Sequence, residues 1–359
     1  MQGTHSFDLA VIGASFAGVA CARAAAARGA SVVVLDRKGD AGKKLHTTGI
    51  IVRDAVEEYA GFRDLPSHLV RRIDAVRLYA PNLRSLRLTS PGYYFLATDT
   101  PQLMRHLAGQ AQREGVTLRM NTWFSGARRA SGRIELDCGI DVRYVVGADG
   151  PRSRVAEAFG LDRNLHFLFG IEHELAGATL PEEDALHCFI DKSLAPGYIG
   201  WALQGVGCVQ VGLARRHPGG TDIAAFAGKL RNVLPIGDGP PSAVRAGLIP
   251  CGGTLSRVAV PGVLLVGDAA GLVSPVTAGG IHTAVRHGDA AGTAIADYLR
   301  GRGEEPAQWF PATYPRFRVK RFLRWGYDRF QADWIFNMML TSWPMRRAAE
   351  TIYFHRRKT

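Results

Sequence analysis

A glycine-rich turn near the amino terminus is the first group of residues whose types and spacing could do chemistry. It consists of Gly13, Ala14, Ser15, Phe16, Ala17 and Gly18. The turn follows an apolar run, residues 7–12, and precedes an alanine-rich stretch that ends at Gly29, which predicts a buried strand, a tight turn and a helix. Free N–H groups and the positive end of such a helix can bind a pyrophosphate. Ser15 stands where these turns usually carry glycine, but serine is small enough for a phosphate to approach.

A carboxylate follows the next predicted strand. Residues 31–35, which are apolar after Ser31, are predicted to form a buried strand, and Asp36 comes after them, 23 positions beyond Gly13. A carboxylate at this place can accept hydrogen bonds from the hydroxyls of an adenosine ribose, and it repels a 2′-phosphate. Together the turn, helix, strand and acid predict a Rossmann-type dinucleotide site. The alternative is a glycine packing turn with Asp36 in solvent.

Two further strand-end acids occur later in the chain. One apolar run, residues 144–147, leads into Asp149 and Gly150, and another, residues 263–266, leads into Gly267 and Asp268. The second is followed by Pro275, Gly279, Gly280 and Ile281, where a helix is expected to begin. An acid at a strand end can bind a ribose or ribityl hydroxyl, and a helix amino terminus can stabilise negative charge on a reduced flavin ring.

These three motifs, in this order, resemble those of the FAD-dependent family that contains the geranylgeranyl reductases and the aromatic hydroxylases of the para-hydroxybenzoate type. The resemblance extends over residues 6–290. It implies that the turn and Asp36 contact the ADP half of FAD, that Asp149 and Gly150 lie near the pyrophosphate or an entering nicotinamide, and that Asp268 holds the ribityl chain or pyrophosphate. The FAD-binding residues expected from the motifs, the resemblance and the neighbouring loops are Gly13, Ala14, Ser15, Phe16, Ala17, Gly18, Asp36, Arg37, Lys44, Gly49, Asp149, Gly150, Gly267, Asp268, Pro275, Gly279, Gly280 and Ile281.

The fold class expected is α/β, a Rossmann-type FAD-binding domain like that of para-hydroxybenzoate hydroxylase, with an inserted β-sheet substrate domain and a C-terminal helical segment. The region between residues 160 and 260 is strand-rich and carries no nucleotide motif, with residues 205–213 as its clearest strand. The FAD-binding domain is expected from residues 1–80, 101–160 and 255–300, the substrate domain from 81–100 and 161–254, and the helical segment from 301–359.

Three residues are candidates for the substrate side of the flavin. Residues 195–201 read Ala-Pro-Gly-Tyr-Ile-Gly-Trp and resemble the substrate strand of the geranylgeranyl reductases, whose aromatic side chains face an isoprenoid tunnel. Tyr198 and Trp201 are therefore candidates for the substrate pocket, with plain core aromatics as the alternative.

The loop at residues 43–50 lies where related flavoproteins pass beside the flavin ring. His46 is the third candidate, because it or a lysine such as Lys44 could donate a hydrogen bond there, and Gly49 allows close backbone approach. An exposed basic loop is the alternative for the lysines.

The leading hypothesis for function is an enzyme in which reduced FAD reduces isoprenoid C=C bonds of a hydrophobic, lipid-like substrate. One alternative is an NAD(P)H-dependent flavin monooxygenase that hydroxylates an aromatic or polycyclic substrate, and another is a non-catalytic, membrane-associated flavoprotein. No second glycine-rich βαβ unit is visible for a stably bound nicotinamide. Electrons are therefore expected from NAD(P)H that docks transiently, from a reductase partner or from a carrier such as ferredoxin.

Charge is concentrated at the carboxyl end. The net charge is +12, and residues 301–359 hold 12 Lys and Arg against 5 Asp and Glu, which makes +7. Four of the six tryptophans lie in the same segment, a composition suited to peripheral contact with anionic lipid. The alternative is that these aromatics pack inward. No motif indicates nucleic-acid binding, and five scattered cysteines predict no metal site. Without a signal sequence or a long apolar stretch, we expect a cytoplasmic protein, either free or peripheral at a membrane.

Overall fold

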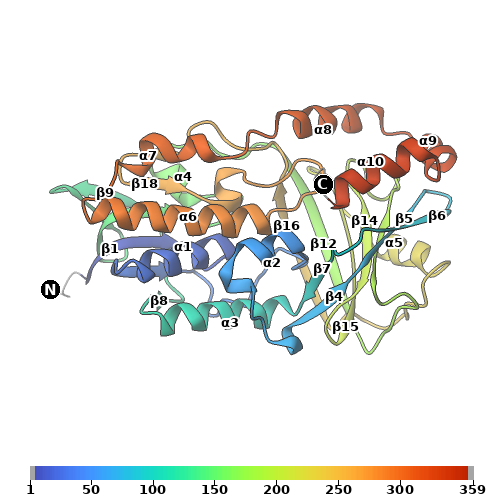
Figure 1. The fold of residues 1–359 in the computed structure, drawn as a ribbon, viewed down its shortest axis with the longest axis horizontal. Coiled ribbons are helices and arrows are strands. Elements are labelled where there is room, and N and C mark those ends of the chain that lie inside the picture. The colour runs from blue at the N-terminus through green and yellow to red at the C-terminus, as the bar shows by residue number, and fades with distance from the viewer. Residues whose placement is uncertain (1–4, 355–359) are drawn as a thin grey trace.

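The computed structural model describes residues 5–354. Residues 1–4 of the expected FAD-binding domain and residues 355–359 of the expected helical segment lie outside the described residues. An eight-stranded sheet and a seven-stranded sheet form the two halves of the molecule, with helices α1 (Phe16–Ala27) and α6 (Ile281–Leu299) beside the first (Figure 1).

The eight-stranded sheet is built around β1 (His5–Ile12), whose apolar second half is buried. Its strands run in the order β17-β18-β11-β1-β2-β8, and β10 and β9 extend it beside β11. Pairings of β1 with β2 and β11, of β2 with β8 and of β11 with β18 are parallel. The other bounds are β2 Val32–Leu35, β8 Thr117–Arg119, β9 Ala127–Ala130, β10 Arg133–Leu136, β11 Ile140–Gly147, β17 Ala259–Val260 and β18 Val263–Leu265.

Helices α1 and α6 pack closely because α6 presents glycines to its neighbour. A Cβ at Gly288 or Gly292 would overlap the carbonyl groups of Ala17 and Cys21 in α1. Helix α3 (Thr100–Arg113) buries its apolar stripe near β8, as its four-residue spacing predicts. The two glycines thus place the middle of α6 against the first half of α1.

The seven-stranded sheet has the order β16-β12-β15-β14-β13-β5-β6. Its strands are β16 Ala243–Pro250, β12 Phe167–Ala176, β15 Cys208–Arg216, β14 Gly200–Gln204, β13 Ala185–Phe189, β5 Ala75–Tyr79 and β6 Ser85–Thr89. Helix α5 (Ile223–Leu230) buries Phe226 and Leu230 against one face. A third, small sheet consists of β3 (Ile51–Val52), β7 (Phe95–Thr98) and β4 (Val70–Ile73).

Two details differ from the sequence-based expectations. Strand β5 precedes residue 81, the expected start of the substrate domain, yet it pairs with β13 and β6 in the seven-stranded sheet. The expected strand at residues 205–213 begins only at Cys208, because Gly205 to Gly207 form the turn between β14 and β15, with Gly207 at φ +70°. The place of β5 was missed because its partner β13 is about 110 residues away in sequence. The start of β15 was missed because apolar patterning does not reveal the turn at Gly205 to Gly207.

The remaining elements are short or C-terminal. Helices α2 (Arg53–Glu58) and α4 (Arg154–Ala158) and the 3₁₀ turns Ala60–Phe62, Ser67–Leu69, Gly267–Ala270 and Phe310–Thr313 connect the sheets. The C-terminal segment holds α7 Pro306–Trp309, α8 Arg318–Phe330, α9 Asp333–Met339 and α10 Trp343–Phe354. Helices α8 to α10 lie along the upper edge of the molecule in Figure 1, toward the seven-stranded sheet. Between residues 5 and 354, no helix has both the length and the apolar character to cross a bilayer.

Candidate functional site

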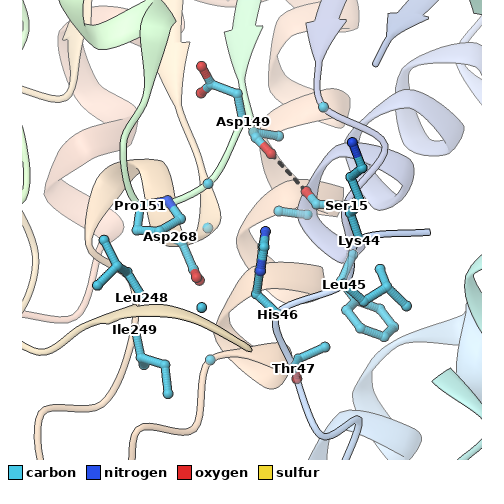
Figure 2. A pocket seen from close by; sticks show the side chains of 18 of the residues that line it. Ser15, Lys44, Leu45, His46, Thr47, Asp149, Pro151, Leu248, Ile249 and Asp268 are labelled. Atoms are coloured by element: carbon cyan, nitrogen blue, oxygen red, sulfur yellow. Dashed lines mark hydrogen bonds between the residues drawn. The ribbon is translucent and has the colours of Figure 1, made fainter. Parts of the chain in front are cut away.

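A cavity of about 720 Å³ lies where the two sheets meet. The β1–α1 turn, the end of β2, the loop at residues 44–48, the turn after β11 and the start of α6 line it on one side, and β12 and β16 line the other. Figure 2 shows part of this lining, with Leu248 and Ile249 of β16 at the left of the view and Ser15, Lys44 and Leu45 at the right. The three motifs, which are more than 100 residues apart, therefore converge on one space.

The β1–α1 turn shows why its residue types are needed. Gly13 has φ +109°, and a Cβ there would overlap the carbonyl of Ala148. The Ser15 hydroxyl accepts a hydrogen bond from the Gly18 N–H (3.2 Å) and donates one to the Ala148 carbonyl (3.0 Å). Serine at this position thus caps the helix and ties the first motif to the second. N–H groups of a first helical turn have no acceptor within the helix, so Ser15, Phe16 and Ala17, which line the cavity, leave donors for an anion.

Asp36 is buried, with 7% of its surface exposed, so the alternative of a solvated acid is wrong. One carboxylate oxygen accepts from the Ala14 N–H (2.8 Å) and the other from the Lys38 N–H (2.9 Å). The carboxylate lines the cavity beside Arg37. Its position at the end of β2 suits a ribose, and that contact stays a prediction.

The Asp149 side chain hydrogen-bonds to backbone N–H groups in this structure. Its Oδ2 accepts from the N–H groups of Arg154 (2.7 Å) and Val155 (3.2 Å), at the start of α4. In Figure 2 the carboxylate points away from His46. Burial raises the pKa of this carboxyl, and Oδ1 has no hydrogen-bond partner in residues 5–354. Asp149 and Gly150 both line the cavity, and their contact with a dinucleotide stays a prediction.

Asp268 is the carboxylate that the site leaves without a counter-charge. It follows β18, lines the cavity and points into it beside His46 (Figure 2). Burial alone raises its pKa to about 6. Gly280 caps α6 nearby, and a Cβ there would lie 3.5 Å from Oδ1, so the start of that helix comes close to the acid. An under-satisfied carboxylate beside a helix amino terminus fits a ligand that brings hydroxyl donors and negative charge, as the ribityl and pyrophosphate groups of FAD do.

His46 and Lys44 line the cavity from the loop before β3. The Nδ1 of His46 lies 2.8 Å from the carbonyl of Ala246, which can only accept, so Nδ1 carries the proton. The imidazole packs on Gly247, where a Cβ would lie 2.6 Å from Nδ1. The loop thereby joins β16, and the other ring nitrogen remains available to a ligand.

Trp201 lines the cavity, but Tyr198 does not. The Tyr198 hydroxyl donates to the carbonyl of Thr277, and its ring packs beside buried Leu168, Ala214 and Cys251. Tyr198 is therefore a core aromatic that braces the loop before α6, and its candidacy as a pocket residue is wrong for this structure.

Several predicted FAD-binding residues do not line the cavity. Those outside the lining are Ala14, Gly18, Gly49, Pro275 and Gly279. Ala14 donates its N–H to Asp36, and a Cβ at Gly49 would overlap the Thr100 hydroxyl, so these two residues shape the wall. The remaining predicted residues line it: Gly13, Ser15, Phe16, Ala17, Asp36, Arg37, Lys44, Asp149, Gly150, Gly267, Asp268, Gly280 and Ile281.

The two charged lining residues of the seven-stranded sheet were not predicted from the sequence. Glu172 in β12 and Arg245 in β16 are direct cross-strand partners. The only signal in the sequence is a charged residue inside each strand-like stretch, and such a residue is indistinguishable from one on a solvated face until the register is known.

Comparisons with known proteins agree with this geometry. Residues 7–173 match the profile of the pyridine nucleotide-disulphide oxidoreductase family, and residues 254–309 match that of the FAD binding domain. A digeranylgeranylglycerophospholipid reductase of Methanopyrus kandleri is 31% identical over 312 residues, which are 82% of this chain and 78% of the relative.

Two solved structures share the fold. A geranylgeranyl bacteriochlorophyll reductase-like protein from Thermoplasma acidophilum superposes with a TM-score of 0.83 at 18% identity, covering 99% of this chain and 98% of the other. A probable FAD-dependent monooxygenase from Pseudomonas aeruginosa gives 0.67 at 19% identity, covering 98% and 100%. The predicted fold class is confirmed.

The fold, the converging motifs and the matched profiles define an FAD-dependent oxidoreductase. The predicted cofactor and enzyme class are thereby confirmed. Within that class, the chain belongs to the family of FAD-dependent oxidoreductases that contains the digeranylgeranylglycerophospholipid reductases.

Proposed function

We propose that this protein reduces isoprenoid C=C bonds of a lipid-like substrate. The observation that carries the proposal is the 31% identity to a digeranylgeranylglycerophospholipid reductase over most of both chains. The cavity supports it, because Trp201 and Ile249, which pack on the same buried cluster, add apolar surface to the wall formed by the seven-stranded sheet. An apolar wall suits a hydrocarbon chain and excludes water from the reacting atoms.

Different residues of the chain contact different parts of FAD. The β1–α1 turn binds the pyrophosphate, Asp36 accepts hydrogen bonds from the adenosine ribose, and Asp268 with the start of α6 holds the ribityl side. When bound and reduced, FAD supplies a hydride. His46, fixed on β16 through its Nδ1–H, offers its second ring nitrogen to the cavity.

The electron donor is proposed to be NAD(P)H docking transiently, or a reductase or ferredoxin partner. A basic rim supports either kind of donor: Arg37, Lys38, Arg152 and Arg154 line the cavity near exposed Trp123. The guanidinium groups of Arg37 and Arg154 lie 5.4 and 5.7 Å from the centre of the Trp123 ring. Such a rim attracts a pyrophosphate or an acidic protein surface.

Product analysis separates reduction from hydroxylation. The protein is incubated with NAD(P)H or a chemical reductant and with either a geranylgeranyl-containing lipid or a panel of aromatic acids. The products are then identified by mass spectrometry. Reduction adds two hydrogens for each double bond without oxygen uptake. NAD(P)H oxidation that consumes O₂ in proportion to a hydroxylated product would overturn the proposal in favour of the monooxygenase.

We also propose peripheral contact with an anionic membrane through α8 and α9. Their apolar side chains face solvent: Phe322 is 68% exposed, Phe330 65%, Trp334 64% and Met338 69%. The alternative of inward-packed aromatics is wrong for these residues. Basic Arg318, Lys320, Arg321 and Arg329 lie in the same helix as Phe322. Apolar and basic side chains together are what anionic headgroups bind.

The same helices touch the loop that precedes β14. The Tyr327 hydroxyl donates to the carbonyl of Tyr198 (3.2 Å), and the Gln331 side chain accepts from the Gly197 N–H (2.9 Å). Contact with lipid would therefore occur beside the strand that carries Trp201. The cytoplasmic address itself stays a prediction.

Vesicle flotation tests the membrane contact. The protein should float with phosphatidylserine-containing vesicles, less with neutral vesicles, and the double variant Phe322→Ser/Trp334→Ser should lose most binding. Leu165→Ser, which removes an 82% exposed apolar side chain elsewhere, is the matched control. Equal flotation of the double variant and the wild type would refute the contact, whereas loss of binding with reductase activity intact would leave the enzymatic proposal standing.

A further inference from the structure

A row of four residues crosses the cavity-lining sheet from strand to strand. Arg245 in β16 is paired with Glu172 in β12, Glu172 with Gly212 in β15, and Gly212 with Trp201 in β14. A Cβ at Gly212 would overlap the Trp201 indole, so glycine lets the ring lie across β15. The Trp201 Nε1–H then donates to Glu172 Oε2 at 2.9 Å. The strand register and the absence of a side chain at Gly212 thus allow the Trp201 indole to hold the Glu172 carboxyl in place.

Glu172 is only 3% exposed and lines the cavity. Its other oxygen, Oε1, has no hydrogen-bond partner among the described residues. The nearest cationic atom recorded for it is Arg245 Nη1, at 3.5 Å. Buried polar atoms are normally hydrogen-bonded, so Oε1 is the atom of this carboxyl that can bond to a group entering the cavity.

The surrounding charges favour the neutral acid. Arg245 is ion-paired more closely with Glu174, and it also donates to the Thr47 carbonyl (3.2 Å) and the Thr100 hydroxyl (3.3 Å). One cation thus faces two carboxyls, and ionising both would bury an excess negative charge.

Burial is the dominant effect on Glu172 and raises its pKa to about 7, although Arg245 and the Trp201 hydrogen bond oppose the rise. Cys208 of β15 also interacts with Glu172, and burial raises the pKa of its thiol to about 11, so the thiol adds no charge at neutral pH. His46, which packs on Gly247, is a further titratable group in the same lining.

We infer that Glu172 is the acid that protonates the substrate carbon during reduction, an inference that rests on the proposed function. Reduction of a C=C bond gives a hydride to one carbon and a proton to its neighbour. The Oε1–H bond of Glu172 breaks as the new C–H bond forms, and the carboxylate that remains is stabilised by Arg245. Water then returns a proton to Oε1, which restores the acid for the next turnover.

The substitution Glu172→Gln tests the inference, because glutamine keeps an acceptor for the Trp201 indole but releases no proton. General acid catalysis contributes roughly 100-fold to 10,000-fold, so we expect product formation to fall at least about 100-fold with FAD affinity within about twofold of wild type. If wild type reduces isoprenoid lipid and Glu172→Gln does so equally fast, the inference is wrong and the proposed function survives. If wild type reduces none, the proposed function fails first.

Infrared spectroscopy gives a reading that needs no turnover. The difference spectrum between wild type and Glu172→Gln at pH 6 should contain the carbonyl band of a protonated carboxylic acid, sensitive to deuterium, that fades as the pH rises through about 7. Absence of that band at pH 6 would overturn the assignment whatever the activity.

The variant Glu174→Gln is a control for a purely structural role. Removing this carboxylate leaves Arg245 to Glu172 alone, which lowers the pKa of Glu172. Wild-type activity should decline as the pH rises through about 7, and in Glu174→Gln the decline should begin at lower pH. An unmoved pH profile together with an equal loss in both variants would show that the row is only structural.

Discussion

Asp268 gives a prediction in which stability and function change in opposite directions. Burial raises the pKa of this carboxyl from 3.8 to about 6 with no cation to compensate. A rise of that size corresponds to at most about 3 kcal/mol of unfolding free energy, lost at any pH above about 6 where the carboxylate is charged in both states. The substitution Asp268→Asn should therefore make the FAD-free protein more stable at pH 8, by up to about 3 kcal/mol.

The sign of the pH dependence follows from the same shift. Between pH 4 and 6 the folded protein binds a proton at Asp268 that the unfolded chain does not, so the wild type gains stability as the pH falls through this window. Asp268→Asn has no such group, and its advantage over wild type should shrink from pH 8 to pH 4. Urea unfolding of the FAD-free proteins at several pH values measures the difference.

The FAD affinity of Asp268→Asn should decrease, although its stability without FAD increases. Hydrogen bonds to a charged acceptor contribute about 1.5 to 3 kcal/mol, so the dissociation constant should rise roughly 10-fold to 150-fold in a fluorescence titration. Asp238→Asn removes the same charge from an exposed loop position and should change neither quantity. A variant that is no more stable than wild type, or that binds FAD as tightly, would refute the assignment of Asp268 to the cofactor.

Substitutions at three further positions test the walls of the site. Gly212→Ala forces the Trp201 indole to move, and product formation should fall at least about tenfold while a titration shows unchanged FAD affinity. Ser15→Ala removes the helix cap and should lower the unfolding free energy in urea by about 1 kcal/mol, whereas Ser15→Gly should lower it by only a few tenths. Gly288→Val pushes α6 away from the Ala17 carbonyl, and calorimetry should show a loss of about 1 to 3 kcal/mol, with weaker FAD binding. Wild-type product formation in Gly212→Ala, or wild-type unfolding free energy in Ser15→Ala or Gly288→Val, would contradict the packing described.

The sequence indicated those parts of the site whose geometry is local. The turn from Gly13 to Gly18 lies directly between a strand and a helix, so its conformation depends on neighbours within a few residues. Asp36 and Asp268 could be placed because each follows an apolar strand, and parallel strands bring their carboxyl ends to one edge.

What could not be predicted depends on contacts between distant segments. Glu172 and Arg245 meet only through the register of β12 and β16, and a slip of one residue would turn both to the other face. Tyr198 looked like a pocket residue because aromatic side chains suit both pockets and cores. Its place in the core is set by Thr277, 79 residues away.

Anaerobic reoxidation of the reduced flavin by a lipid tests the central claim most directly. The protein is loaded with FAD, reduced, and mixed without oxygen with a geranylgeranyl-containing phospholipid while the flavin absorbance is followed. We expect the oxidised spectrum to return with one double bond saturated for each flavin. A flavin that stays reduced until oxygen is admitted, and then yields a hydroxylated product or none, would contradict the assignment.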